Sequence, residues 1–466
     1  MEKKHFFYAL VLTCTLFTST PKLNADDFED AFTAVANMRI GWNIGNTLDS
    51  NSGDTLNMWI EKWSSRRPVD YETAWGQPQA TKALIHMFKE AGFNAIRVPV
   101  TWYPHYGTIT LNDLTWNMST WSGYAVNSAW LNRVKQVVDY VIDEGMYCIL
   151  NVHHDTGAAS TAWLVADEAA YTAQKYRFET LWTKIANAFK DYDEHLLFEG
   201  YNEMLDTYRS WCYASFGSPN QYDAATATSA YNAINSYAQS FVTKVRATGG
   251  NNAQRNLIVS TYGACCGEGT WSSHLTEPLT NMKLPDDKVD NHIIFEVHTY
   301  PDIKNLTTTK SNVRTMISRL KSMLVSKGAP VIFGEWGSSG VDSGDYEKYK
   351  DNLLEFARFF VEQATAAGMG TFMWMSLSDG NDRSVPKWTQ EDLKDAIVKG
   401  YYGEGGYQPD IAGDVNGDRN VDINDVVAVI NEMAGTAKYD KSDVNGDNAV
   451  NINDVVAIIN IMAGGE

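Results

Sequence analysis

Residues 129–155 read AWLNRVKQVVDYVIDEGMYCILNVHHD and contain one complete unit of the predicted fold. The apolar residues of 129–145 recur at the spacing that gives an amphipathic helix one buried face. Gly145 is typical of a helix end. The run 147–152 is continuously apolar, as expected for a parallel strand that is covered on both faces. A helix followed by a buried strand favours an α/β fold.

The same alternation continues through residues 26–403, which we expect to form one domain. Amphipathic segments such as 82–92, 311–328 and 345–368 separate the apolar runs. Eight units favour closure into a (β/α)8 TIM barrel, which can hold from roughly 200 to over 400 residues. An open doubly wound sheet is the alternative, but the glycine-rich phosphate turn typical of such sheets is missing after the first run. The expected strands are 38–42, 95–100, 147–152, 196–200, 256–260, 293–297, 330–333 and 370–374.

Polar residues gather where these runs end, and barrel enzymes carry their chemistry at the carboxyl ends of the strands. Glu203 follows the fourth run and Glu335 the seventh, so their carboxyl groups can face each other across the barrel mouth. A glycoside hydrolase needs such a pair, one to protonate the leaving oxygen and one to attack the anomeric carbon. A purely structural role, in which each glutamate only pairs with Arg or His, is the alternative. The other candidates at these ends are Asn46, Arg97, His153, His154, Asn202, His298, Tyr300 and Trp374.

The neighbouring residue types suit the two roles. Arg97 beside Glu335 would keep that carboxylate ionised, while burial and a second negative charge would keep Glu203 protonated. Asn202 can donate a hydrogen bond to a sugar hydroxyl, and Tyr300 can orient Glu335. From the residues alone, the catalytic interpretation is therefore favoured over the structural one.

The composition fits a protein that binds a neutral polymer. The net charge of −19 argues against nucleic acid as a partner, because that binding relies on Lys and Arg. The 15 Trp, 24 Tyr and 18 Phe exceed what a core usually needs, and flat aromatic faces stack on sugar rings. Trp374 offers such a face at the barrel mouth, whereas Trp75 and Trp102 are compatible with either the cleft or the core.

Six segments, in order along the chain, resemble glycoside hydrolase family 5 and, more narrowly, its bacterial endoglucanase and xyloglucanase subgroup. The resemblance implies a retaining enzyme with Glu203 as acid/base and Glu335 as nucleophile, and no cofactor for catalysis. It implies substrate contacts for Arg97, His153, Asn202, His298, Tyr300 and Trp374 and, at less widely shared positions, for His154 and Asn46. The segments are GWNIGNTLD (41–49), NAIRVPVTW (94–102), LNVHHD (150–155), EGYNE (199–203), EVHTY (296–300) and FGEWG (333–337).

The substrate that the resemblance implies is a β-1,4-glucan of the cellulose-like, mixed-linkage or xyloglucan type. β-Mannanase or xylanase activity within the family is one alternative, because subsite contacts rather than the catalytic pair select the sugar. A non-catalytic glycan-binding scaffold protein is another. Residues 375–378 (MSLS) depart from the aromatic-Asp-Asn-Gly run that is usual after the last strand, so the subsites there are expected to differ.

Residues 1–25 are predicted to be a signal peptide, because Lys3 and Lys4 precede a short apolar run and then small and turn-forming residues. The run is too short to span a membrane. We therefore expect a secreted or cell-surface-associated protein without a membrane span. Export permits disulfides, but free thiols and one bridge remain equally compatible with the four later cysteines, Cys148, Cys212, Cys265 and Cys266.

Residues 411–466, which follow a short linker at 404–410, contain a duplicated loop-and-helix pattern. The loops DVNGDRNVDIND (414–425) and DVNGDNAVNIND (443–454) lie 29 residues apart. Oxygen ligands at positions 1, 3, 5, 7, 9 and 12 suit Ca²⁺, which predicts two ions. The pattern resembles a type I dockerin, a small all-α calcium-binding module, and this implies a cohesin-bearing scaffold protein as partner. The expected ligands are Asp414, Asn416, Asp418, Asn420, Asp422 and Asp425, then Asp443, Asn445, Asp447, Ala449, Asn451 and Asp454, with Asn420 and Ala449 acting through their carbonyls.

Overall fold

The structure is a computed structural model that describes residues 28–339, 345–375, 379–439, 441–447 and 449–464. The predicted signal peptide at 1–25 lies outside the described residues, as do residues 376–378 of the divergent run after the last strand. Within the described part, none of the helices has an apolar stretch long enough to cross a bilayer.

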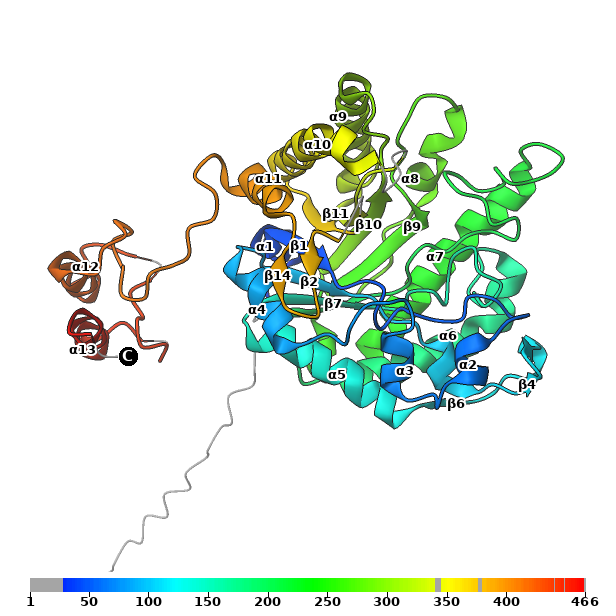
Figure 1. Ribbon diagram of the computed structural model, residues 1–466, viewed down its shortest axis with the longest axis horizontal. Helices are drawn as coiled ribbons and strands as arrows, with labels where there is room; N and C mark the ends of the chain where they lie inside the picture. The colour runs from blue at the N-terminus through cyan, green and yellow to red at the C-terminus, as the bar shows by residue number, and fades with distance from the viewer. Residues whose placement is uncertain (1–27, 340–344, 376–378, 440, 448, 465–466) are drawn as a thin grey trace, which may run out of the picture.

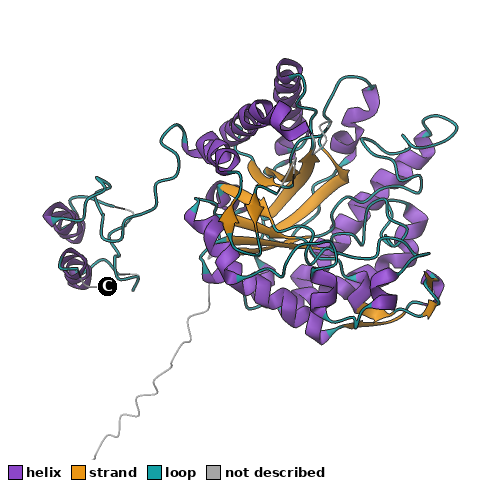
Figure 2. Cartoon of the chain, in the orientation of Figure 1, coloured by secondary structure: helices purple, strands orange, loops and turns teal. Residues whose placement is uncertain are grey.

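The eight expected strands form a closed, entirely parallel barrel (Figure 2). Each strand pairs with the next barrel strand along the chain, and the first also pairs with the last, which closes the ring. The (β/α)8 prediction is therefore confirmed, and the open doubly wound alternative is excluded. The barrel strands are β1 (Ile40–Asn43), β2 (Ala95–Val98), β7 (Tyr147–Asn151), β8 (Leu196–Glu199), β9 (Leu257–Cys265), β10 (Ile293–Thr299), β11 (Val331–Trp336) and β12 (Gly370–Met373).

Helices surround the barrel, as Figure 1 shows. The apolar faces of most of them belong to one continuous core, whereas those of α1 (Ala31–Met38) join a second cluster with strand residues. α5 (Ser128–Asp143) and α4 (Lys82–Glu90) lie where the sequence predicts them. The other helices of this part are α1 (Ala31–Met38), α2 (Trp59–Trp63), α3 (Pro68–Glu72), α6 (Glu168–Ala188), α7 (Ala224–Ala247), α8 (Glu277–Asn281), α9 (Leu306–Met323), α10 (Tyr346–Ala366) and α11 (Glu391–Tyr402).

β9, β10 and β11 continue past the ends of their apolar runs, so that polar residues expected after the strands lie within them. The pairing register shifts between Glu296 and His298 and between Phe333 and Trp336. Such β-bulges re-aim side chains and are frequent beside active sites. Hydrophobic periodicity does not reveal them, which is why the expected strands are too short. The loops carry short strands: β3 (Tyr106–Thr108), β4 (Leu111–Asn112), β5 (Thr115–Trp116), β6 (Ser122–Val126), β13 (Asn381–Asp382) and β14 (Lys387–Trp388).

The C-terminal segment has its own small core. Each predicted loop is followed by a helix, α12 (Ile423–Met433) or α13 (Ile452–Met462). Val429 and Ile458 are fully buried between them, within a cluster that contains no barrel residue. Asp422 and Asn451 cap the two helices through capping boxes, so both loops lead into a helix in the same way.

All four cysteines that the structure describes are free thiols. Cys148 is buried in β7, as its apolar neighbours predict, and Cys266 is also buried. Of the two possibilities that the sequence left open, the structure has the one without a bridge.

Candidate active site

The site begins with a change of polarity inside the barrel. An apolar layer near the amino ends of the strands packs with α1. Side chains two positions apart on a strand share a face, so the residues two positions further along also point inward, and they form a polar layer. The apolar members are Ala95, Ile149, Leu197, Ile258, Ile294 and Ile332, and the residues two positions later are Arg97, Asn151, Glu199, Ser260, Glu296 and Gly334.

Arg97 is the centre of this layer and is fully buried. Its guanidinium donates to both oxygens of Glu199, at 2.6 and 2.8 Å, and to the side-chain oxygen of Asn202 at 2.7 Å. It also donates to Glu335 Oε1 at 2.8 Å. Burial opposes a charged guanidinium, but Glu199 and the other carboxylates raise the pKa of Arg97 well above its ordinary value. Arg97 is therefore a permanent cation below the catalytic candidates.

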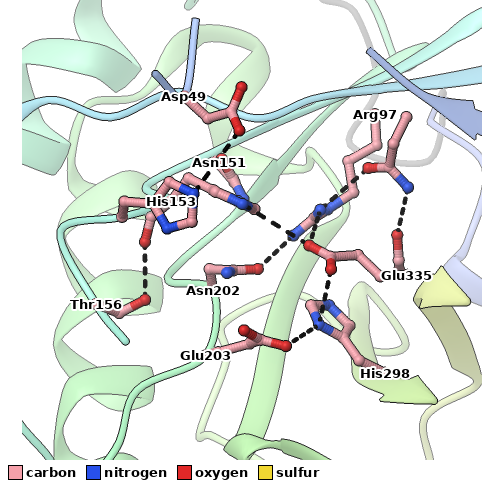
Figure 3. A network of polar contacts seen from close by, with 12 residues as sticks. Asp49, Arg97, Asn151, His153, Thr156, Asn202, Glu203, His298 and Glu335 are labelled. Carbon is pink, nitrogen blue, oxygen red and sulfur yellow. Dashed lines mark hydrogen bonds and ion pairs between the residues drawn. The ribbon is translucent and has the colours of Figure 1, made fainter. Parts of the chain in front are cut away.

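Glu203 and Glu335 face each other beside this cation (Figure 3). One oxygen of each carboxyl group and one nitrogen of His298 all lie within 4.8 Å of one another. Glu203 follows β8 and Glu335 lies in β11, so two strands three places apart in the ring supply the pair. A common atom can therefore be reached by both carboxyl groups, which is the geometry that the sequence analysis required.

Glu335 is almost fully buried, and each of its oxygens accepts a hydrogen bond. Arg97 donates to Oε1, and the Tyr300 hydroxyl donates to Oε2 at 2.6 Å. Burial raises the pKa of Glu335, whereas the positive charges of His298 and Arg97 lower it. Arg97 thus acts on the pKa of Glu335 in the expected direction. The effect of burial is larger, so the pKa is raised overall. The contacts themselves are those of an ionised carboxylate, which accepts hydrogen bonds and has no proton to donate.

Glu203 is the more accessible of the two, with 21% of its side chain exposed. Its Oε1 lies 2.9 Å from His298 Nδ1. The carboxyl group opens onto a hollow of about 440 Å³, to which Trp211, Cys212 and Leu275 contribute apolar wall. The hollow lies on the Glu203 side of the pair. It has room for a group that is attached to a sugar bound at Glu335.

Aromatic rings lie beside Glu335, because His153 Nε2 is 3.8 Å from Glu335 Oε1. His153 stacks on Trp374, with ring centroids 5.5 Å apart and planes at 11°. His154 packs against Trp75 at 5.3 Å. Burial lowers the pKa of both histidines, so they are neutral at pH 7. Trp102 is fully buried, so of the two tryptophans left open above, Trp75 belongs to the cleft and Trp102 to the core.

Asn46 is held at the edge of this side by Asp49. The backbone N–H of Asn46 donates to Asp49 Oδ2 at 3.1 Å, and His154 Nε2 lies 3.7 Å from the same oxygen. Asn46 has a φ of 58°, a left-handed conformation that asparagine tolerates better than most residues. Asp49, His153 and His154 also bring three ligand atoms within 4.8 Å, but their protein contacts explain the arrangement without a metal.

Three residues of the polar layer, Asn151, Glu199 and Glu296, are not among the site residues predicted from the sequence. Glu199 pairs with Arg97, and Asn151 donates to Glu199 Oε1 at 2.8 Å. Glu296 contacts His298 Nε2 at 3.3 Å. A signal existed: Glu296 lies two positions before His298, and Glu199 lies four before Glu203, so strand periodicity places them on or near the same inward face.

In the C-terminal loops, the structure places the expected calcium ligands along two equivalent turns before α12 and α13. At position 12, Asp425 and Asp454 are fully buried. Each accepts backbone N–H groups from both ends of its own loop. Within the described residues, sets of three Asp, Glu, His or Cys ligand atoms that lie within 4.8 Å occur only at the barrel site. Calcium binding here would therefore use a mixed set of carboxylate, amide and carbonyl oxygens.

A closed parallel barrel that brings two carboxyl groups together at the carboxyl ends of its strands has the arrangement of a glycoside hydrolase. The family model described as Cellulase (glycosyl hydrolase family 5) matches residues 63–380. The chain belongs to this family and is a glycoside hydrolase of the cellulase type.

The relatives that the chain matches include endoglucanases and a cellulase/esterase. Endoglucanase A of Clostridium longisporum is 32% identical over 404 residues, covering 82% of this chain and 68% of that protein. The cellulase/esterase CelE of Acetivibrio thermocellus is 30% identical over 79% of this chain but only 40% of its own length. The chain therefore spans a varying share of its longer relatives.

Solved structures agree with these relatives. A GH5-4 broad specificity endoglucanase from an uncultured bacterium is 49% identical, with a TM-score of 0.73, and the match covers 81% of this chain and 96% of that one. A family 5 enzyme of Prevotella bryantii, solved in complex with a xyloglucan tetradecasaccharide, is 38% identical with a TM-score of 0.67, covering 80% and 99%.

Proposed function

We propose that this protein is a secreted, retaining endo-β-1,4-glucanase in which Glu203 is the acid/base and Glu335 the nucleophile. The observation that carries the proposal is the distance between the two carboxyl groups, whose nearest oxygens lie within 4.8 Å. Retaining enzymes hold their carboxyl groups about 5–5.5 Å apart, whereas inverting enzymes need about 6.5–9.5 Å to admit a water molecule. The short separation supports direct attack on the sugar.

In the first step, Glu335 Oε attacks the anomeric carbon while Glu203 donates its proton to the glycosidic oxygen. The C–O bond to the leaving chain breaks, and a covalent glycosyl-enzyme forms. Glu203, now a carboxylate, takes a proton from water, and the resulting hydroxide equivalent attacks the same carbon and releases Glu335. Tyr300 and Arg97 hold Glu335 on the correct face of the sugar throughout.

The cleft supports a sugar chain that extends on both sides of the pair. His153, Trp374 and Trp75 would contact the units whose reducing carbon reacts. The apolar hollow beside Glu203 would receive the leaving part of the chain, with Trp211 as an exposed aromatic face. The endoglucanase relatives and the xyloglucan-bound structure support β-glucans as the substrate class.

On a panel of polysaccharides, we expect release of reducing ends from carboxymethylcellulose, lichenan and xyloglucan at least about tenfold faster than from mannan or xylan, because mismatched hydroxyl contacts lower transition-state binding. An endo enzyme should lower the viscosity of carboxymethylcellulose before many reducing ends appear. Proton NMR of the first product should show the β-anomer. Faster release from mannan would favour the mannanase alternative, and binding without any release would favour a scaffold protein.

We further propose that the C-terminal segment is a dockerin module with two Ca²⁺ ions, which docks onto a cohesin-bearing protein. The duplicated loops and their equivalent helix caps support this proposal. Each helix also exposes an apolar stripe with the same spacing, typical of a docking face. The stripes are Ile423, Val427, Ile430 and Met433 on α12, and Ile452, Val456, Ile459 and Met462 on α13.

Removal of calcium should unfold this module and leave the barrel intact. Six buried apolar residues give it little core of its own, and an ion at 1,000 times its Kd contributes about 4 kcal/mol. Calorimetry of the full chain should show two transitions, of which EGTA shifts only the smaller to lower temperature, with hydrolysis unchanged. Excess CaCl₂ should return the smaller transition to its original temperature. A smaller transition whose temperature changes with neither EGTA nor CaCl₂ would contradict the calcium assignment.

A further inference from the structure

Glu296 is a buried carboxylate that the proposed mechanism does not use. It lies in β10, two residues before His298, and is fully buried. Its place depends on Gly334, because a Cβ atom at that position would fall 1.6 Å from Glu296 Oε1. Burying a charge is costly unless it has partners. The Glu296 carboxylate therefore fits in the barrel only because residue 334 is a glycine. The groups that contact this carboxylate indicate its role.

Three groups contact the Glu296 carboxylate. The Ser260 hydroxyl donates to Oε2 at 2.6 Å. Oε1 lies 3.3 Å from Arg97 Nε and 3.3 Å from His298 Nε2. Arg97 already makes two shorter bonds to Glu199, at 2.6 and 2.8 Å, so Glu296 is a secondary partner for the arginine. For His298, in contrast, Glu296 supplies the contact at Nε2.

The other nitrogen of His298 faces the catalytic pair, at 2.9 Å from Glu203 Oε1 and 3.5 Å from Glu335 Oε2. We propose that Glu296 is a positioning residue for the reaction: it holds the His298 ring through Nε2, so that a protonated Nδ1 faces both Glu203 and Glu335. This inference rests on the roles proposed above for those two glutamates. Glu296 touches neither of them and acts through the ring.

A comparison of two equally buried histidines shows what the carboxylates do. Burial alone would lower the pKa of His298, but Glu335, Glu203 and Glu296 together raise it to about 10. His153, whose Nδ1 pairs with a side-chain amide, has its pKa lowered well below the ordinary value. His298 is therefore an imidazolium at pH 7 and His153 is neutral. The charged or titratable groups that interact with His298 or with its partners are Glu203 after β8, Glu199 in β8, Glu335 in β11, Glu296 and Tyr300 in β10, Arg97 in β2 and His153 after β7.

The sign of the expected effect follows from these charges. The positive charge of His298 lowers the pKa of Glu335 and so opposes the effect of burial. Without the Glu296 charge, only Glu335 and Glu203 would oppose the effect of burial on His298, and the ring would lose its proton at a lower pH. On the acidic limb of the kcat/KM profile, which reports the ionisation of Glu335, the ring is charged with or without Glu296. The titration of His298 itself is therefore the property that depends on Glu296.

The test substitutes Glu296→Gln, which keeps the shape and removes the charge. In the wild type, ¹⁵N NMR of labelled histidine, assigned with a His298→Gln variant, should show both His298 nitrogens protonated at pH 7. In E296Q the pKa of His298 should fall by about one to three units. The matched control is Ser260→Ala, which removes a 2.6 Å hydrogen bond to the same carboxylate but keeps its charge. In Ser260→Ala the pKa of His298 should stay within about a few tenths of a unit of the wild-type value.

Two results would overturn the inference. One is a wild-type His298 that is neutral at pH 7, which needs no variant and decides the matter even if E296Q does not fold. The other is a folded E296Q with a lower melting temperature but an unchanged His298 titration, as expected of a structural carboxylate. If the wild type hydrolysed no glycan, the proposed function would fail, whereas the NMR titration would still test the contact between Glu296 and His298.

Discussion

Glu335→Ala should lower kcat/KM on carboxymethylcellulose by roughly 10⁴- to 10⁶-fold, the range measured when a nucleophile or its direct partner is removed from other enzymes. The variant has no group that can form the glycosyl-enzyme, and a water molecule in the vacated space would lack a carboxylate to activate it. The barrel should remain folded, because Arg97 keeps its two bonds to Glu199. Reducing-end release, circular dichroism and melting temperature measure these outcomes.

A matched control is Glu72→Gln. Glu72 is also fully buried and paired with an arginine, Arg133, at 2.7 and 2.8 Å, but it lies in α3 outside the barrel. It should lose stability and keep activity. Azide provides a positive test. With a dinitrophenyl β-cellobioside, Glu335→Ala should form the α-glycosyl azide, because azide occupies the space that the Glu335 carboxylate has vacated and attacks from that face of the sugar. A variant with more than a hundredth of wild-type activity would refute this assignment.

Glu203→Ala should lower activity on polysaccharides by about 10²- to 10⁴-fold, the usual contribution of a general acid or base. The loss should be much smaller for formation of the glycosyl-enzyme from a dinitrophenyl glycoside, because that leaving group departs without a proton. Stopped-flow measurement of dinitrophenolate should therefore show a burst followed by a slow steady state.

With this variant, azide should give the β-glycosyl azide, since it attacks the intermediate from the side that Glu203 has vacated. The opposite anomers from the two variants would together fix which glutamate has which role. An α-product from Glu203→Ala, or an equal loss with good and poor leaving groups, would mean that the two roles are exchanged or that neither residue protonates the leaving oxygen.

Most of the fold was predictable because parallel strands covered on both faces leave a simple signal. Each of the eight apolar runs overlaps a barrel strand, and Gly145 lies just beyond the end of α5 as expected. The extension of β10 and β11 was not predictable, since it depends on the bulges beside His298 and Trp336. A bulge is set by pairing with neighbouring strands, and no local pattern in the chain encodes it.

The candidate site was predictable to the extent that its residues follow strand ends. Glu203, Glu335 and their direct contacts come together as the order of the strands implies. The second set of charges was harder to recognise, because Glu199 and Glu296 lie inside strands, where an acidic residue would ordinarily be unfavourable. Only the three-dimensional packing shows that Arg97 and His298 supply positive charges next to Glu199 and Glu296.

The free thiols of the barrel have a consequence for where such an enzyme can work. Its described cysteines form no cross-links, and the core is held by packed apolar side chains. A reductant that would destabilise a secreted protein by reducing its disulfides has no disulfide to reduce among the described cysteines. The barrel can therefore keep its shape in anoxic, strongly reducing surroundings, and refolding would not depend on pairing sulfur atoms correctly.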